Sequence, residues 1–203
     1  EPLMFRLSAL SSFLSVFVGA SVASAQVAAP AEVEGMKLIF NGKDLSGWEY
    51  GSVPPVKNPP PVEKLEGKTQ SSDGVFFVKD GMLIASGKKI KALYTAKEFN
   101  KDLHLKFEFR ATSDKPKDNS GVFLRKWQLQ LDATNEKGSL TGTFRNIKNF
   151  KVGGWNQIDV TVRGTEATCF CNGEQIMKKA QTIPATGTIG FQSEYGQFEF
   201  RRI

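Results

Sequence analysis

Apolar and polar side chains alternate along several short stretches of this chain. The clearest stretch is 103–110, LHLKFEFR, where every second residue from Leu103 is Leu or Phe. Residues 155–163, WNQIDVTVR, alternate in the same way from Ile158. Because successive side chains of a β-strand point to opposite faces of its sheet, both stretches predict strands with one buried face.

Turn signals separate these stretches. Asp80-Gly81 and Asn172-Gly173 each join two of them, and such pairs supply the positive φ that tight hairpin turns require. No helical period is sustained, and only residues 95–101 could hold one helical turn. Many short strands with frequent glycine-containing turns predict an all-β sandwich of two antiparallel sheets. The expected strands are residues 36–40, 76–78, 82–85, 103–110, 122–125, 127–132, 155–163, 167–171, 174–177, 188–192 and 198–203.

The stretch NSGVFLRKWQLQLD (119–132) contains candidate ligand-binding residues. Its first three residues, Asn119–Gly121, predict a polar turn that leads into two strands. In the second strand Gln128, Gln130 and Asp132 share one face, and Arg125 ends the first strand. Amides and a guanidinium beside a carboxylate suit a hydroxyl-rich ligand, because they offer planar paired donors and acceptors. A polar outer face held by cross-strand pairs is an equal alternative.

The beginning of the chain has the pattern of a secretory signal peptide. Arg6 precedes a largely apolar run at 7–22, and Ala23-Ser24-Ala25 is a small-x-small cleavage site. The apolar run contains five serines and no stop-transfer pattern follows it, so no membrane attachment is expected after cleavage. We expect an exported protein, periplasmic or secreted. The expected organisation is a signal peptide at 1–25, a linker at 26–35 and one domain at 36–203.

The formal charge of +6 comes from basic residues that are scattered along the chain. A nucleic-acid-binding surface needs a basic stripe with interleaved aromatics, so nucleic acid is not an expected partner. The two cysteines, Cys169 and Cys171, lie two residues apart on one predicted strand, an extended geometry near the upper limit for a disulfide. We expect them to be small buried apolar side chains, because a metal site would need more ligands.

Residues 51–73 differ from the rest of the chain, because five of the nine prolines lie between Pro54 and Pro61. Proline cannot donate to a sheet ladder, which excludes a central strand there. One interpretation is a mobile insertion. The other, which we favour, is a wall or lid at the mouth of a site, since a proline-rich segment loses little entropy when it is fixed.

Nine short motifs, read in order, resemble the 3-keto-disaccharide hydrolase domain family. The resemblance covers about residues 36–203. It implies a concanavalin A-like jelly-roll sandwich, similar to laminin-G domains, in agreement with the strand pattern. The motifs are LIFNGKDLSGW (38–48), VKDGMLIA (78–85), LYTAKEFNKDLHLKFEFR (93–110), NSGVFLR (119–125), QLQLD (128–132), GGWNQIDVTVRG (153–164), CNGEQI (171–176), PATGTIGFQ (184–192) and FEFRRI (198–203).

The resemblance implies hydrolysis of small glycosides whose sugar is oxidised to a ketone at C3. The ketone acidifies the hydrogen on C2, so a base can remove it; the enolate then expels the aglycone from C1, and water adds back. This chemistry needs a general base, a donor for the enolate oxygen and a group that assists the leaving oxygen. It requires no cofactor. A divalent metal on the enolate oxygen is an alternative, but no dense cluster of ligands in the sequence predicts one.

Three residues are candidates for catalysis through the family's motifs and strand parity. Asp132 ends Gln130-Leu131-Asp132 and is the expected base, with Glu108 as the second choice. Arg125 follows the Asn-Ser-Gly motif and is expected to hold the enolate oxygen in the same groove, on the concave sheet. The other residues expected to line this groove and bind substrate are Asn119, Gln128, Gln130, Trp127, His104, Arg110, Gln192 and Glu194, whereas Trp155 is expected to anchor the core.

Two other functions are compatible with the sequence. A non-catalytic carbohydrate-binding domain would use the same groove, but would not need a base with a perturbed pKa. A structural domain of the laminin-G type would present an exposed apolar patch to a protein partner instead of a polar groove. The oligomeric state and the aglycone stay open.

Overall fold

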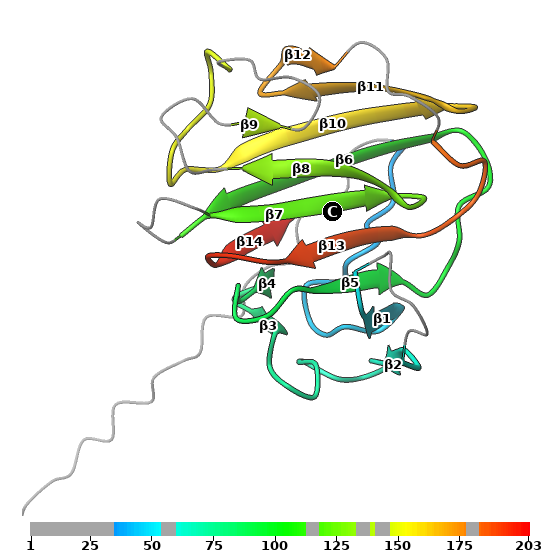
Figure 1. Ribbon diagram of the computed structural model, residues 1–203, viewed down its shortest axis with the longest axis vertical. Helices are drawn as coiled ribbons and strands as arrows, with labels where there is room; N and C mark the ends of the chain where they lie inside the picture. The colour runs from blue at the N-terminus through cyan, green and yellow to red at the C-terminus, as the bar shows by residue number, and fades with distance from the viewer. Residues whose placement is uncertain (1–34, 54–59, 113–117, 133–138, 141–146, 178–182) are drawn as a thin grey trace, which may run out of the picture.

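The computed structural model describes residues 35–53, 60–112, 118–132, 139–140, 147–177 and 183–203 (Figure 1). Within these ranges the chain forms two antiparallel sheets of seven strands each and no helix, which confirms the expected all-β sandwich. Accordingly, none of the described residues belongs to a helix that could cross a membrane. The expected signal peptide, and the expected linker up to residue 34, lie outside the described residues.

The front sheet lies nearer the viewer in Figure 1 and has the strand order β2-β1-β5-β13-β7-β8-β9. Its two hairpin partners β7 and β8 are joined by a two-residue turn, and β13 inserts between β7 and β5. The strands are β1 (Trp48–Gly51), β2 (Glu63–Lys64), β5 (Lys91–Thr95), β7 (Asn119–Leu124), β8 (Trp127–Asp132), β9 (Ser139–Leu140) and β13 (Ile189–Ser193).

The back sheet has the strand order β12-β11-β10-β6-β14-β4-β3. Its centre is β6, which pairs with β10 along most of its length and with β14 only from Glu108 to Ala111. The strands are β3 (Phe76–Lys79), β4 (Met82–Ala85), β6 (Leu103–Ala111), β10 (Asn156–Arg163), β11 (Glu166–Cys171), β12 (Glu174–Met177) and β14 (Phe198–Arg201).

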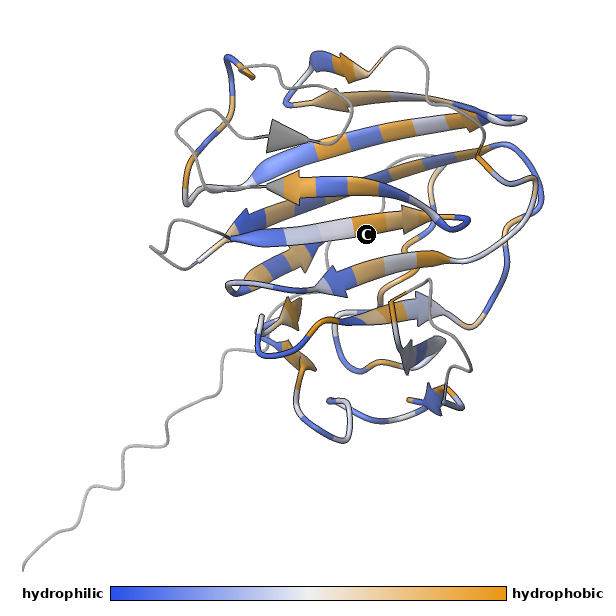
Figure 2. Cartoon of the chain, viewed as in Figure 1, coloured by the Kyte–Doolittle hydropathy of each residue, from blue (hydrophilic) through white to orange (hydrophobic). Residues whose placement is uncertain are grey.

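Aromatic side chains from both sheets form the centre of the core. The ring of Phe191, from the front sheet, lies 4.7 Å from that of Phe200 and 5.5 Å from that of Phe107, both in the back sheet. All three are buried, and burial of each such side chain stabilises the fold by about 2–3 kcal/mol. The alternation along the strands supplies these inward side chains; Figure 2 shows it as alternating colours on β8 and β10.

Three predicted elements differ from the structure. Residues 36–40 form no strand, and their backbone is tied to the chain by one hydrogen bond from Ile39 N to Ile203 O (2.9 Å). Asn119–Gly121 is not a turn, since these residues begin β7 and pair with β8. Trp48, which lies in none of the predicted strands, begins β1 and is buried. Residues 95–101 contain no helical turn.

Both predicted hairpins are confirmed. Asp80 (φ 50°) and Gly81 (φ 75°) join β3 to β4, and Asn172 (φ 49°) and Gly173 (φ 81°) join β11 to β12. These are the positive φ values that the turn type requires. The paired residues on either side therefore keep their apolar side chains on the core face.

The two cysteines behave as expected. Cys169 and Cys171 are free, fully buried and part of the core cluster. Their burial raises the pKa of each thiol to about 12. They are structural apolar side chains of the back sheet.

The described parts of the long proline-rich segment lie along the edge strands β2 and β3 of the two sheets. Glu63 and Lys64 form the edge strand β2, which is separated from β7 by β1, β5 and β13. Glu63 accepts hydrogen bonds from Lys68 Nζ (3.0 Å) and Ser72 N (3.1 Å), which fold the following residues against the edge. Glu63 and Lys64 are therefore an edge of the front sheet, whereas Gln70 forms a β-bridge with Phe77 in β3 of the back sheet. Residues 54–59, where most of the prolines occur, lie outside the described residues, so the lid stays a prediction.

Candidate functional site

The outer face of the front sheet carries a row of side-chain amides from three adjacent strands. In β8, Gln128 pairs with Phe123 and Gln130 pairs with Gly121, while the intervening Leu129 is buried in the core. Residues that pair across a sheet point to the same face, so these four face away from the core. We call this row the amide face; its amide-bearing members are Asn119, Gln128, Gln130 and Gln192.

The amides of the amide face form one hydrogen-bonded chain. Gln128 Nε2 donates to Gln192 Oε1 on β13 (2.6 Å) and to Gln130 Oε1 (3.2 Å). Gln130 Nε2 donates in turn to Asn119 Oδ1. Because each bond occupies the oxygen of the next amide, it orients that amide and leaves its NH2 group to donate further along the chain. At the end of the chain, Asn119 Nδ2 has no hydrogen-bond partner within the described ranges, so it is a pre-oriented donor.

Glycine makes this chain of amides possible. A Cβ atom on Gly121 would overlap the Gln128 amide nitrogen and would lie 2.9 Å from Gln192 Oε1. On the neighbouring strand, a Cβ on Gly190 would lie 2.5 Å from the Tyr94 ring. The two glycines leave the space above the sheet in which amide and ring side chains from adjacent strands meet.

Three acidic residues are backbone neighbours of the Asn119 end of the amide face. Asp118 precedes Asn119 and is 3% exposed, and Asp132 is the cross-strand partner of Asn119. Glu194 precedes Tyr195, which forms a β-bridge with Asn119. The structure describes only the backbone of Asp132, and Asp118 has partners of its own. At this end of the amide face, an amide donor without a partner in the described ranges therefore lies near acidic residues in the backbone.

Glu194 has a carboxyl group whose raised pKa suits a general base. It follows β13 where the pairing with β7 changes register, from Phe191 opposite Val122 to Tyr195 opposite Asn119. The residue is half-buried, and this burial raises the pKa of its carboxyl group above the ordinary value. A raised pKa makes a carboxylate a stronger base once it is ionised.

Aromatic side chains continue the same face toward β5. Tyr94 packs on Phe123 with a ring-centroid distance of 5.7 Å, and the Tyr94 hydroxyl donates to the carbonyl of Ser52 (3.3 Å). Burial raises the pKa of the Tyr94 hydroxyl, so it stays protonated. Tyr94 is half-buried and offers an apolar ring edge beside the amides, as sugar sites commonly do.

Arg125 is not on the amide face, which corrects the predicted groove. Arg125 (φ 51°) and Lys126 (φ 75°) form the turn between β7 and β8, whereas Asp132 lies at the other end of β8. At about 3.3 Å per residue, the two ends of such a strand are on the order of 17 Å apart. Arg125 is 1% exposed, and its Nη2 donates to the carbonyl of Lys101. The alternation of side chains that predicted an outward Arg125 ends with β7 at Leu124, because the chain then reverses in the turn.

His104, Glu108 and Arg110 are also misplaced by the sequence prediction. They do share one face of β6, but β6 belongs to the back sheet, so they lie on the opposite side of the sandwich from Gln128. There they form ion pairs within that sheet. The pairs are His104–Asp159 (2.6 Å), Lys106–Asp159 (3.2 Å), Glu108–Arg201 (2.5 Å), Glu108–Arg202 (3.0 Å) and Arg110–Glu199 (2.6 Å).

Neither Trp127, a predicted substrate-binding residue, nor Trp155, a predicted core residue, lies where the sequence predicted. Trp127 is half-buried and packs against the core rather than on the amide face. Trp155 does not anchor the core, because it lies on the outer face of the back sheet. The guanidinium groups of Arg110 and Arg201 lie 4.6 Å and 3.9 Å from its ring centre. Trp155 stabilises the guanidinium groups of Arg110 and Arg201, both of which form the ion pairs given above, by cation–π contact.

Of the residues predicted for one groove, the structure brings together Asn119, Gln128, Gln130 and Gln192, with Glu194 and the backbone of Asp132 at one end. Sequence reasoning missed Asp118 and Tyr94. Tyr94 lies in a motif of the family resemblance, but neither residue stands in a clean alternating run. In the described part of the chain, no group of three His, Cys, Asp or Glu side chains could hold a metal ion.

Residues 35–203 match the family described as the 3-keto-alpha-glucoside-1,2-lyase-like domain. Among solved structures, a proposed glycosyl hydrolase from Parabacteroides distasonis is similar, with a TM-score of 0.56 and 18% identity over 82% of this chain and 90% of that chain. A carbohydrate binding module from Bacillus subtilis has a TM-score of 0.51 and 9% identity, covering 77% of this chain and 92% of its own. At these identities the two structures establish the fold alone. No curated protein matches the chain in sequence.

Proposed function

Because the chain belongs to the family of 3-keto-alpha-glucoside-1,2-lyase-like domains, we propose that it is a carbohydrate-active enzyme that cleaves glycosides whose sugar carries a ketone at C3. The observation that carries the proposal is the amide face with Glu194 beside it. The amides suit sugar hydroxyl groups, and a carboxylate with a raised pKa suits removal of a proton from carbon. The two similar sandwiches support a carbohydrate ligand.

The reaction begins when the base removes the proton from C2. The electron pair of that C–H bond forms the C2–C3 double bond of an enolate, and the negative charge moves to the former ketone oxygen. As the ketone re-forms, the C2–C3 electron pair becomes a C1–C2 double bond, the bond from C1 to the aglycone oxygen breaks, and that oxygen takes a proton. Water then adds its hydroxyl to C1 and a proton to C2. The net reaction consumes one water and releases the aglycone and a 3-keto sugar.

We assign the base to Glu194 and the enolate donor to Asn119. Asn119 Nδ2 is held in place because Gln130 occupies its Oδ1, so the donor is oriented before substrate arrives. Gln128 binds sugar hydroxyls, and the buried Gln192 holds the Gln128 amide in place. Asp132, the base expected from the sequence, lies opposite Asn119 across the β7–β8 pair and is the competing assignment.

The test is release of aglycone from a panel of 3-keto-glycosides, with the unoxidised parents as controls. Glu194→Gln keeps the shape of the side chain and removes the base, so kcat should fall by at least about a hundredfold. Glu98→Gln is the matched control. Glu98 is exposed and follows β5, away from the Asn119 end of the amide face, so this variant should keep full activity. Loss of activity in Asp132→Asn with full activity in Glu194→Gln would move the role of base to Asp132. Full activity in both would overturn the site.

The donor has its own test. Only interactions that strengthen as charge develops raise the rate, so Asn119→Ala should lower kcat more than it raises KM. By analogy with oxyanion donors the loss is about a hundredfold. A rise in KM with kcat unchanged would show that Asn119 only binds the substrate.

A non-catalytic carbohydrate-binding domain is the second candidate, favoured by the similarity to the carbohydrate binding module. It uses the same amide face. It predicts that the parent protein binds sugars, that Gln128→Ala weakens this binding, and that no 3-keto-glycoside releases its aglycone. Calorimetry with unoxidised and 3-keto sugars, run beside the aglycone assay, separates the two candidates.

We also propose that the protein is exported, because residues 1–25 have the pattern of a signal peptide. Mass spectrometry of the protein from its native host should find an N-terminus near Gln26. Retention of residues 5–25 would contradict export by this route.

A further inference from the structure

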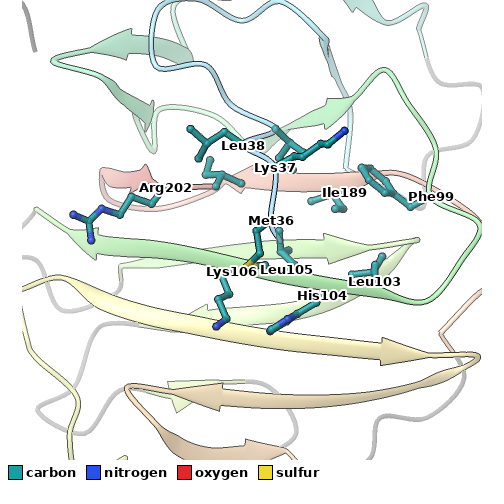
Figure 3. A pocket seen from close by; sticks show the side chains of 12 residues that line it. Met36, Lys37, Leu38, Phe99, Leu103, His104, Leu105, Lys106, Ile189 and Arg202 are labelled. Atoms are coloured by element: carbon teal, nitrogen blue, oxygen red, sulfur yellow. The ribbon is translucent and has the colours of Figure 1, made fainter. Parts of the chain in front are cut away.

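An apolar pocket of about 440 Å³ opens on the back of the sandwich, away from the amide face. It lies beside the first half of β6, where β14 no longer pairs with that strand. The coil at 36–39 and the last residues, 202–203, lie across this gap and are joined by the hydrogen bond from Ile39 N to Ile203 O (Figure 3). The pocket is therefore an opening in the back sheet that leads to the core.

The wall of the pocket is apolar. Eight of its twelve lining residues are apolar, and they include Met36, Phe99, Leu103 and Ile189. Met36, Phe99 and Leu103 are only half-buried, although all three are large and apolar. A pocket of a few hundred Å³ with such a lining has the size and character of a small-molecule site.

The rim of the pocket is cationic. The four remaining lining residues are Lys37, His104, Lys106 and Arg202, and none of the twelve has an acidic side chain. Lys106 pairs with Asp159, and Arg202 shares Glu108 with Arg201, so with Lys37 the basic side chains around the rim outnumber the acidic ones. Lys37 is exposed and has no ion-pair partner in the described ranges. An apolar cavity below an excess of positive charge complements a ligand with an apolar tail and an anionic head.

We propose that this pocket binds a single long-chain carboxylate, with the alkyl chain against Met36, Leu103 and Ile189 and the carboxylate at Lys37. Burial of the chain supplies the affinity, and the rim orients the ligand. The alkyl stems of Lys37 and Lys106 cover the mouth while their ammonium groups stay in water. The site is separate from the amide face, so binding does not require the reaction proposed above.

Isothermal titration of the full chain with octanoate, decanoate and dodecanoate, below their micelle concentrations, tests the pocket. We expect one saturable site and binding that tightens about fourfold per added methylene until the pocket is filled. Dodecanol and dodecyltrimethylammonium are the comparisons for the head group, and both should bind more weakly than dodecanoate. Equal or tighter binding of either would overturn the anionic head. Absence of saturable binding by any of the carboxylates would overturn the pocket.

Two variants locate the site. Lys37→Glu reverses the free charge of the rim and should weaken dodecanoate by about threefold to tenfold, as expected for an exposed ion pair replaced by repulsion. Met36→Asp should weaken it by more than about tenfold, because it places a charge in the apolar wall. Lys79→Glu makes the same charge change on the exposed end of β3 and should leave the affinity unchanged. Equal weakening by Lys37→Glu and Lys79→Glu would show attraction to the net charge only.

A measurement on the unaltered protein covers the case in which a variant does not fold. The chain has four methionines, of which Met82 lies on β4 and Met177 on β12. With methyl-labelled methionine, dodecanoate should shift the NMR signal of Met36 and leave those of Met82 and Met177 in place. A shift at Met82 or Met177 without one at Met36 would overturn the location. Aglycone release has no part in this readout, so failure of the enzymatic proposal leaves it interpretable.

Discussion

The amide face requires a residue without a side chain at position 121, which is Gly121. In Gly121→Ala the new methyl group would overlap the Gln128 amide nitrogen, so the bond from Gln128 to Gln192 cannot form in its present geometry. Displaced binding groups misplace the substrate, and we expect kcat/KM to fall by about tenfold to a hundredfold. Steady-state kinetics on a 3-keto-glycoside measure this.

Gly51→Ala is the control for that change. It is also a glycine of the front sheet, but its added methyl group would meet only Val62 Cγ1, at 3.3 Å. Gly51→Ala should therefore keep its kinetics. Equal losses in both variants would mean that any added methyl group in this sheet acts through stability, not through the amide face.

Glu194 should show a trade between activity and stability. Because burial raises the pKa of its carboxyl in the folded protein, the fold binds this proton more tightly than the unfolded chain does. The contribution of Glu194 to stability is then complete below the ordinary glutamate pKa and is lost as pH rises through the raised value. Glu194→Gln has no charge to desolvate, so its Tm should exceed that of the parent at neutral pH and approach it in acid. A variant that melts earlier at neutral pH would contradict this sign.

For single residues, the sequence correctly predicted part of the side-chain arrangement. The spacing of Gln128 and Gln130 placed both on one face because β8 is a regular strand. Parity failed for Arg125, since a residue with positive φ in a turn no longer follows the alternation of the strand. It also failed for Glu108, because alternation shows which residues share a face but not which of the two sheets they belong to.

The β11–β12 hairpin depends on Asn172 in two ways. Its backbone has φ 49°, and its side chain accepts from Gln157 N (2.8 Å) and donates to Asn149 O (2.7 Å) and Asn156 Oδ1 (2.9 Å). Asn172→Gly keeps the turn but loses these bonds, which should cost about 1–2 kcal/mol in the free energy of unfolding. Asn172→Ala should cost about 1 kcal/mol more, because Cβ disfavours the left-handed region. Denaturant titration measures both, and equal losses would show that the turn geometry carries no strain.

Elements with local signals were predictable and elements without them were not. Asp-Gly and Asn-Gly mark their hairpins in the sequence, and the structure has both. Residues 36–40 look like a strand because four of the five are apolar, yet their backbone forms no ladder and makes one hydrogen bond within the described ranges, to Ile203. Residues 36–39 line the back pocket instead. β1 was missed because Trp48 follows a glycine-rich turn, and its partner β5 is more than forty residues away in the sequence.

For the whole molecule, the two buried thiols report on the integrity of the sandwich. Cys169 and Cys171 are inaccessible, and burial raises the pKa of each to about 12, so almost no thiolate exists at neutral pH. The folded protein should react with a thiol reagent only at the rate at which the back sheet opens. In denaturant, both thiols should react at once. Rapid labelling of the folded protein would mean that β11 is far more open than its packing indicates.

The place of β13 and β14 in the two sheets has a consequence for how the protein is made. β13 pairs with β5 and β7, and β14 pairs with β4 and β6, so strands from the last part of the described chain close the middle of both sheets (Figure 1). Until residues 189–201 leave the ribosome, four earlier strands have no neighbour on one side. Long-range pairing of this kind makes folding slow and leaves open strand edges for a long time. The sandwich therefore stays open until residues 189–201 have been synthesised, and an unfolded chain is the state that the export proposed above requires.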